Sequence, residues 1–307
     1  MAVDPGSEPQ ESARPAGFER SSQHVLMLED RVRTRGFLQA IRETVRPGDV
    51  VVDIGTGTGI LAIAAALAGA RHVYAVELTA MAETARRGIT ANGLADRVTV
   101  VHGTSTEISL PERADVVISE TIGDDLFDES ILPTLADAAA RLAKPTARFV
   151  PRALRPVVIP TCIDDEIWRR RFYSPELVRG WSDEYVIDLS WLDAEPRRAE
   201  RFPRARAYLG DGPRIDLPAV TFPGTDATYD RTVTWTADRA LRVNALLLGF
   251  ASDLGPVTLT NVTRDTSSWE LPADVLPQTY EIHEGDTVDV RVRWSAGMSA
   301  VEWQPIP

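Results

Sequence analysis

The chain has 307 residues, of which 44% are hydrophobic and 25% charged, as is ordinary for a globular protein with a substantial core. Its formal net charge of −12 disfavours a nucleic-acid partner and favours a cationic substrate or partner. Cys162 is the only cysteine, which excludes an intrachain disulfide and predicts a reducing cytoplasm, and no apolar run is long enough for a membrane span.

The first segments in chain order are a polar stretch and a helix. Residues 1–17 are rich in Pro, Glu, Ser and Gly, so we expect them to be disordered and to be neither a signal peptide nor an anchor. Residues 21–45 read as a helix that ends before Pro47 and Gly48.

The next segment is the most informative. The β-branched run 50–54 ends in Asp53 and Ile54, a glycine turn follows, and an apolar helix is predicted over 60–68. A second strand, 73–77, ends in Glu77, which could accept hydrogen bonds from a ribose diol. This order predicts the first half of a doubly wound parallel sheet, with a ligand outside the carboxyl ends of the strands.

The spacing of Gly55, Gly57 and Gly59 leaves three interpretations open. A dinucleotide fingerprint would have its third glycine at Ile60 or Ala62, which weakens a nicotinamide cofactor without excluding it. The turn could also serve only to pack a helix on a strand. The sequence DIGTGTG resembles motif I of S-adenosylmethionine-dependent methyltransferases, whose turn wraps the methionine moiety and ribose of the cofactor.

Strands and helices alternate to about residue 150, and after Pro160 the chain changes character. We expect strands at 98–102, 115–119 and 146–150 and helices at 80–92 and 131–143, which is the rhythm of a parallel sheet. Pro151 and Pro156 are expected to close this unit. Short strand-like runs separated by Gly, Pro and Asp then predict an antiparallel β-barrel or sandwich: 219–222, 232–236, 241–250, 257–262, 279–282 and 287–294.

The second informative segment is acidic. Between Glu112 and Glu129 there are seven acids and one base, Arg113. The strand 115–119 ends at Glu120, so the loop that follows is expected at the same edge of the sheet as the glycine turn. Two carboxylates there can grip a guanidinium or hold an ammonium, although such a loop could also be a solvated helix cap.

These motifs together resemble the protein arginine methyltransferase family. Ser119-Glu120 and Glu129-Ser130 match its "double-E" loop, spacing included, and HVLMLEDRVRT (24–34) is similar to the helix before its motif I. The resemblance implies a Rossmann-like methyltransferase domain over 18–155 and a β-barrel-like substrate domain over 156–307. It also implies a homodimer, formed through an arm at about 165–212.

The resemblance assigns roles to individual residues. Arg33 would pair with the methionine carboxylate of S-adenosylmethionine, with His24 nearby, Met27 beside the methyl-transfer site, and Glu77 on the ribose. Glu120 and Glu129 would be the catalytic pair that holds the substrate guanidinium, with Asp124 and Trp269 in substrate binding and no metal. The remaining cofactor contacts would come from Asp53, Gly55, Thr56, Gly57, Gly59, Ile60, Leu61, Leu78, Ser105, Thr106 and Glu120.

The sequence also departs from the family pattern. The aromatic segment expected near 14–18 is absent, and the Thr-His-Trp loop appears as Ser267-Ser268-Trp269, without the histidine. Thr106 stands where an acid would accept the adenine amino group. These departures predict a divergent, bacterial member that methylates free arginine or arginine in a peptide, for instance in natural-product biosynthesis. An amine such as a peptide N-terminus as acceptor, and a cofactor-binding partner without catalysis, are the alternatives.

Overall fold

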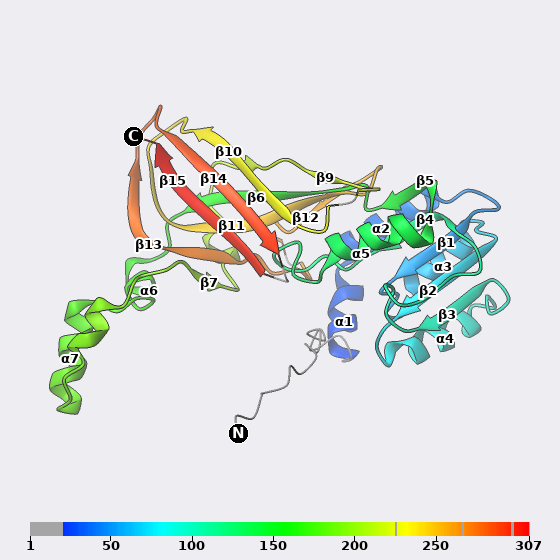
Figure 1. Ribbon diagram of the computed structural model, residues 1–307, viewed down its shortest axis with the longest axis horizontal. Coiled ribbons are helices and arrows are strands. Elements are labelled where there is room, and N and C mark those ends of the chain that lie inside the picture. The colour runs from blue at the N-terminus through cyan, green and yellow to red at the C-terminus, as the bar shows by residue number, and fades with distance from the viewer. Residues whose placement is uncertain (1–20, 225, 266, 296–297, 307) are drawn as a thin grey trace, which may run out of the picture.

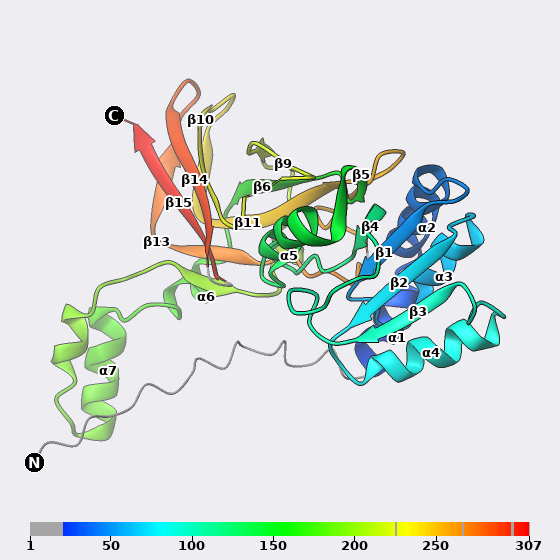
Figure 2. The same ribbon diagram turned by 45° about the vertical axis from the view of Figure 1, so that its right-hand side comes forward.

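The computed structural model describes residues 21–224, 226–265, 267–295 and 298–306, and the predicted disorder of 1–17 lies outside them. A parallel sheet with its helices lies at one end of the molecule and antiparallel sheets lie at the other (Figure 1). The helix α7 (Pro175–Tyr185) projects from the antiparallel part, as the rotated view also shows (Figure 2).

The first sheet is parallel and has the strand order β3-β2-β1-β4-β5. Its strands are β1 (Val50–Ile54), β2 (His72–Glu77), β3 (Val98–His102), β4 (Ala114–Ser119) and β5 (Ala143–Val150). The chain steps outward from β1 to β3 and then returns to β4 on the other side of β1. The carboxyl ends of β1 and β4 therefore form the switch point where ligands bind in such folds, which confirms the predicted doubly wound domain.

The helices of this part are α2 (Arg31–Thr44), α3 (Ile60–Leu67), α4 (Met81–Ala91) and α5 (Ile131–Asp137). Two differ from prediction. The expected helix 131–143 finishes as a π-helix, Ala138–Leu142. The single helix expected over 21–45 is wrong, because α1 (Ser21–Glu29) ends before Asp30, whose side chain accepts a hydrogen bond from Arg33 N and so caps a second helix, α2.

The second half is antiparallel, as predicted, and in the described residues it forms a seven-stranded and a three-stranded sheet. The larger sheet contains β6 (Ala153–Thr161), β7 (Glu200–Phe202), β8 (Ile215–Asp216), β9 (Val220–Thr221), β11 (Leu241–Asp253), β12 (Thr258–Thr260) and β13 (Ala273–Ile282). The smaller sheet contains β10 (Tyr229–Thr236), β14 (Thr287–Ser295) and β15 (Met298–Ile306).

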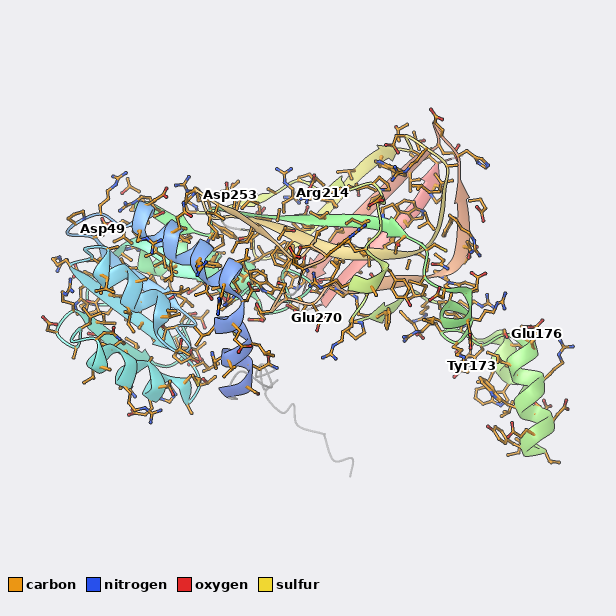
Figure 3. All side chains as sticks on the ribbon, turned by 180° about the vertical axis from the view of Figure 1, so that it is seen from behind. Asp49, Tyr173, Glu176, Arg214, Asp253 and Glu270 are labelled. Carbon is orange, nitrogen blue, oxygen red and sulfur yellow. The ribbon has the colours of Figure 1, made fainter. Side chains whose placement is uncertain are left out.

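The antiparallel part begins a few residues before the predicted domain boundary at Pro156, with strand β6. This strand pairs with β11 from Ala153 to Thr161, so the antiparallel part begins before Pro156 and runs through it. Between β6 and β8, where the arm is expected, the chain has α6 (Asp165–Arg169), α7, two short 3-10 helices at Ser190–Ala194 and Arg206–Tyr208, and β7, which pairs with β13 of the larger sheet. Tyr173 and Glu176 mark where α7 begins, away from the three sheets (Figure 3).

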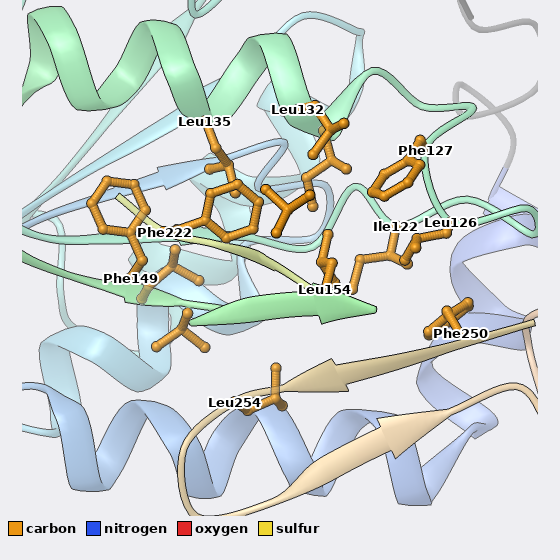
Figure 4. Packing of buried hydrophobic residues seen from close by; sticks show 14 of the residues in the cluster. Ile122, Leu126, Phe127, Leu132, Leu135, Phe149, Leu154, Phe222, Phe250 and Leu254 are labelled. Atoms are coloured by element: carbon orange, nitrogen blue, oxygen red, sulfur yellow. The ribbon is translucent and has the colours of Figure 1, made fainter. Parts of the chain in front are cut away.

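One hydrophobic cluster joins the two halves. The loop after β4 contributes Ile122, Leu126 and Phe127, which face Leu154 of β6 and Phe250 of β11 (Figure 4). The apolar side chains of this loop are thus buried in the shared core, and its acidic side chains are held at the junction of the two halves.

Candidate active site

The glycine turn lies between β1 and α3, and all three of its glycines have positive φ. The values are 75° for Gly55, 53° for Gly57 and 84° for Gly59, a region that side chains rarely adopt. A Cβ on Gly57 would lie 2.9 Å from the His24 imidazole, so α1 packs directly on the turn. His24 is buried there and Met27 is half-buried on the same helix.

Two acidic side chains accept hydrogen bonds from this turn. Asp53 is fully buried and accepts a hydrogen bond from Thr56 Oγ1 at 2.5 Å; burial, with a smaller effect of the Glu77 charge, raises its pKa to about 7. Glu77 accepts from Gly57 N–H at 2.8 Å through Oε2 and from Thr79 through Oε1. Since Asp53 lies beneath the turn, its geometry favours support of the turn over direct contact with a ligand.

The other predicted cofactor residues border the same edge of the sheet. Ile60 and Leu61 begin α3 and are half-buried, whereas Leu78, after β2, is exposed. Ser105 and Thr106 lie on the loop after β3, where the carbonyl of Ser105 accepts a hydrogen bond from Arg141 at 2.7 Å. The structure therefore brings these residues to the carboxyl ends of β1, β2 and β3.

Arg33 connects the turn side of the site to the acidic loop. It is buried, donates to the carbonyl of Met27 at 3.2 Å, and forms an ion pair with Glu120. Its guanidinium lies 5.5 Å from the ring centroid of Trp269. Burial lowers the pKa of Arg33 to about 10, against the opposing charges of Asp30 and Glu129, so the side chain remains a cation at neutral pH.

The acidic loop gathers carboxylates whose pKa values are raised. Burial is the main cause for Glu129, whose pKa rises to about 8, and the charges of Asp128 and Asp124 raise it further while Arg33 opposes them. The pKa of Asp128 rises to about 7, again through burial first and then Asp125 and Asp124. The carboxyl groups of Glu129 and Asp128 therefore change protonation close to neutral pH.

Residues 267–270, in the second half of the chain, pack against this loop. Trp269 is buried and its indole N–H donates to the carbonyl of Ile122 at 2.7 Å. Asp124, predicted to bind substrate, accepts from Glu270 N–H at 2.8 Å. Asp30 accepts from Ser268 N–H at 2.8 Å and from both serine hydroxyls, so the serines contact Asp30 at the position where the family pattern has a histidine.

Three residues that support the acidic loop were not predicted from the sequence: Asn261, Arg201 and Arg206. Asn261 is fully buried, and its amide donates to the carbonyls of Asp124 and Glu270. Arg206 donates to the carbonyls of Asn261 and Thr263. No local pattern marks these side chains, because each acts on segments far from it in the sequence.

The model of one family, described as ribosomal protein L11 methyltransferase (PrmA), matches residues 32–151. A probable protein arginine N-methyltransferase 6.1 of Oryza sativa subsp. indica is 36% identical over 196 residues, 63% of this chain and 48% of that protein. A probable histone-arginine methyltransferase 1.4 of Arabidopsis thaliana is 47% identical over 169 residues, 54% of this chain and 32% of that protein.

The chain thus spans less than half the length of these curated relatives. Solved structures match it more fully. The Trypanosoma brucei PRMT1 enzyme-prozyme heterotetrameric complex with AdoHcy gives a TM-score of 0.73 at 22% identity, covering 94% of this chain and 99% of that one. Arabidopsis thaliana protein arginine methyltransferase 10 gives 0.73 at 23% identity, covering 94% and 98%. At these identities the likeness establishes the two-part fold.

Proposed function

We propose that this chain, which belongs to the protein arginine methyltransferase-like family of class I methyltransferases, transfers a methyl group from S-adenosylmethionine to a guanidinium nitrogen of arginine. The observation that carries the proposal is the ion pair between Arg33 and Glu120. It places the cation expected to bind the cofactor carboxylate against an acid expected to bind the acceptor, at the switch point of the sheet.

The residues at the turn fit S-adenosylmethionine. The left-handed glycines let backbone approach a ligand closely, and Glu77 Oε2 accepts one hydrogen bond in the structure, which leaves it a lone pair for a ribose hydroxyl. Arg33 supplies a buried cation for the amino-acid carboxylate. When bound, the cofactor supplies a sulfonium methyl group that a nitrogen can take by in-line displacement.

Glu120 and Glu129 would hold the guanidinium and orient it for attack. A guanidinium nitrogen has its lone pair delocalised, and flanking carboxylates can concentrate the positive charge away from the attacking nitrogen. The raised pKa of Glu129 suits it to accept the proton that this nitrogen loses. Trp269 and Asn261 would support the loop from the second half, with Trp269 lying under Arg33.

The test is methyl transfer from labelled S-adenosylmethionine to free arginine, acetyl-arginine amide, an arginine-centred peptide and an amine-bearing peptide. Glu129→Gln is expected to lower turnover by at least about a hundredfold while the protein still binds S-adenosylhomocysteine. Glu83→Gln, an exposed change on α4, is the matched control. Undiminished transfer in both Glu120→Gln and Glu129→Gln would remove the carboxylate pair from the mechanism.

The identity of the acceptor is the finer part of the proposal. A small or peptide acceptor in specialised metabolism is a prediction based on the altered aromatic segment near 14–18, and transfer to the amine peptide alone would favour the ammonium alternative. Binding of S-adenosylhomocysteine with no transfer to any acceptor would favour the non-catalytic partner.

We also infer a homodimer formed through the arm. On the arm, Val186 and Trp191 are 90% and 61% exposed, and in the first half of the chain Leu26 of α1 and Val32 of α2 are 55% and 76% exposed. Two such apolar surfaces on one chain can cover each other head to tail in a symmetric pair.

A further inference from the structure

Arg201 of β7 connects three segments of the second half to the acidic loop. Its Nε donates to Asp274 Oδ1 at 2.6 Å, and its Nη1 donates to Asp125 Oδ2 at 3.2 Å. Its Nη2 donates to the carbonyl of Ser299 at 3.4 Å. The Asp125 and Asp274 side chains are 12% and 8% exposed, so this is a partly buried network and not a solvated surface pair.

Asp125 links Arg201 to the backbone of the loop at the proposed acceptor site. While Oδ2 accepts from Arg201, Oδ1 accepts from Asp128 N–H at 3.1 Å, and Asp128 is the neighbour of Glu129. An unbroken series of contacts therefore runs from Asp274 through Arg201 and Asp125 to the backbone beside Glu129. Leu126 and Ser130 in this stretch have positive φ, at 76° and 61°, conformations that side chains adopt only when the surroundings hold them there.

The charge of Arg201 acts on the same part of the loop. It opposes the rise in the pKa of Asp128 that burial and the neighbouring acids cause. The Glu120 half of the loop is anchored differently, by Arg33 and by the bond from Trp269 to Ile122. The two catalytic glutamates therefore depend on separate supports.

We propose that Arg201, acting through Asp125, is a positioning residue that fixes Glu129 for the acceptor guanidinium, an inference that rests on the proposed function. Arg201 touches neither substrate nor cofactor in this scheme. Its effect should therefore be confined to the acceptor, because the cofactor turn shares none of its contacts.

The experiment measures acceptor kinetics at saturating S-adenosylmethionine, with acetyl-arginine amide and the arginine-centred peptide as probes. Asp125→Ala removes the contact to the loop and leaves the pair between Arg201 and Asp274 in place. We expect kcat/KM for the acceptor to fall about ten- to a hundredfold, because a reacting group misplaced by about 1 Å costs that much. The dissociation constant of S-adenosylhomocysteine is expected to stay within about twofold of wild type.

A second variant separates charge from geometry. Arg201→Lys keeps the cation, but its three N–H donors share one nitrogen, which cannot reach all the acceptors that Nε, Nη1 and Nη2 of Arg201 reach, so a smaller loss on the acceptor side is expected. Combining it with Asp125→Ala should add little to the loss from Asp125→Ala alone, since both changes break one chain of contacts. Arg214→Met, which breaks an exposed pair with Asp216, is the matched control.

The possible results separate a failure of this inference from a failure of the proposed function. A wild-type protein that methylates none of the acceptors would refute the proposed function, and the inference with it. An active wild type with unchanged acceptor kinetics in Asp125→Ala and Arg201→Lys would refute the inference alone. Equal losses of acceptor activity and cofactor affinity would also refute it, because they would indicate a general structural role.

Discussion

Arg33 is a buried cation that lies between the glycine turn and the acidic loop. It pairs with Glu120 and faces the ring of Trp269, and burial lowers its pKa while leaving it charged at neutral pH. A buried charge is tolerated only when it is paired, so removing this side chain would leave Glu120 without its partner. The same cation would serve the cofactor carboxylate, and substitutions at Arg33 should therefore affect both ligands.

Arg33→Ala is expected to weaken binding of S-adenosylhomocysteine about ten- to a hundredfold, as the loss of a charge-assisted hydrogen bond implies. Isothermal titration calorimetry measures this directly. Arg35→Ala, an exposed change on the same helix, is the control and should leave the affinity unchanged. Equal affinities in wild type and Arg33→Ala would disprove this role.

The acidity of Glu129 predicts how activity depends on pH. The carboxylate must be ionised to hold a guanidinium and accept its proton, and its pKa is raised to about 8 by burial, Asp128 and Asp124, against Arg33. For an N-acetylated arginine peptide, whose guanidinium does not titrate in this range, kcat/KM should rise with pH and reach half its maximum near pH 8. A half-maximum below about pH 6 would contradict this assignment, since it would match an ordinary carboxyl group.

At the scale of elements, the junction of α1 and α2 determines how the site is closed. Asp30 caps α2 through Arg33 N and also accepts hydrogen bonds from Ser267 and Ser268. One carboxylate therefore orients the helix that carries Arg33 and holds the segment that carries Trp269. Burial alone would raise the pKa of Asp30, but these hydrogen bonds outweigh it and leave the pKa below its ordinary value.

Asp30→Ala should reduce the free energy of unfolding by about 1 to 3 kcal/mol, the combined effect of a lost helix cap and unpaired donors. Because the folded-state pKa is depressed, the contribution of Asp30 is present above the unfolded value and is lost as pH falls below about 4. Urea unfolding at pH 7 and pH 3 measures both effects. Asp183→Ala, exposed on α7, is the control; a loss from Asp30→Ala that is as large at pH 3 as at pH 7 would contradict the ionic origin.

At the scale of the molecule, the two halves share one core and the site lies at their junction. Hydrophobic residues from the loop after β4, from α5 and from the antiparallel sheets form a single cluster. The carboxylates of the acidic loop therefore take their positions from both halves, and neither half alone would complete the acceptor side. None of the described helices has the length and apolar character needed to cross a membrane.

If the inferred homodimer forms, both apolar surfaces are required for association. Trp191→Asp on the arm and Leu26→Asp on α1 should each convert a dimer into a monomer, because both side chains would be buried between protomers. Sedimentation velocity measures the change. Ile306→Asp, an exposed apolar position on β15, is the control, and a wild type that sediments as a monomer at every concentration would refute the dimer.

The sequence predicted those parts of the fold whose pattern is local. The run 50–54, the glycine turn and the strand 98–102 are set by β-branched residues and glycines that are adjacent in sequence. Strand β6 was missed because Pro156 and Pro160 resemble a break, although both residues pair with β11. The break at Asp30 was missed because its cause is a cap, which periodicity does not reveal.

The same distinction holds for the site. Glu120, Glu129 and Arg33 were predicted from the acidic loop and from the resemblance to the family motifs, and the structure brings them to one edge of the sheet. Their roles, and that of Trp269 in substrate binding, stay predictions. The supports from Asn261 and Arg201 join segments 137 and 76 residues apart, so only the folded chain reveals them.

The most direct measurement is a crystal structure with S-adenosylhomocysteine and an arginine peptide bound. We expect the cofactor product in the bend at Gly55–Gly59, with its carboxylate on Arg33 and its ribose on Glu77, and the peptide guanidinium between Glu120 and Glu129. A bend without the cofactor product, or both glutamate side chains pointing into solvent away from the peptide, would contradict the proposed methyl transfer.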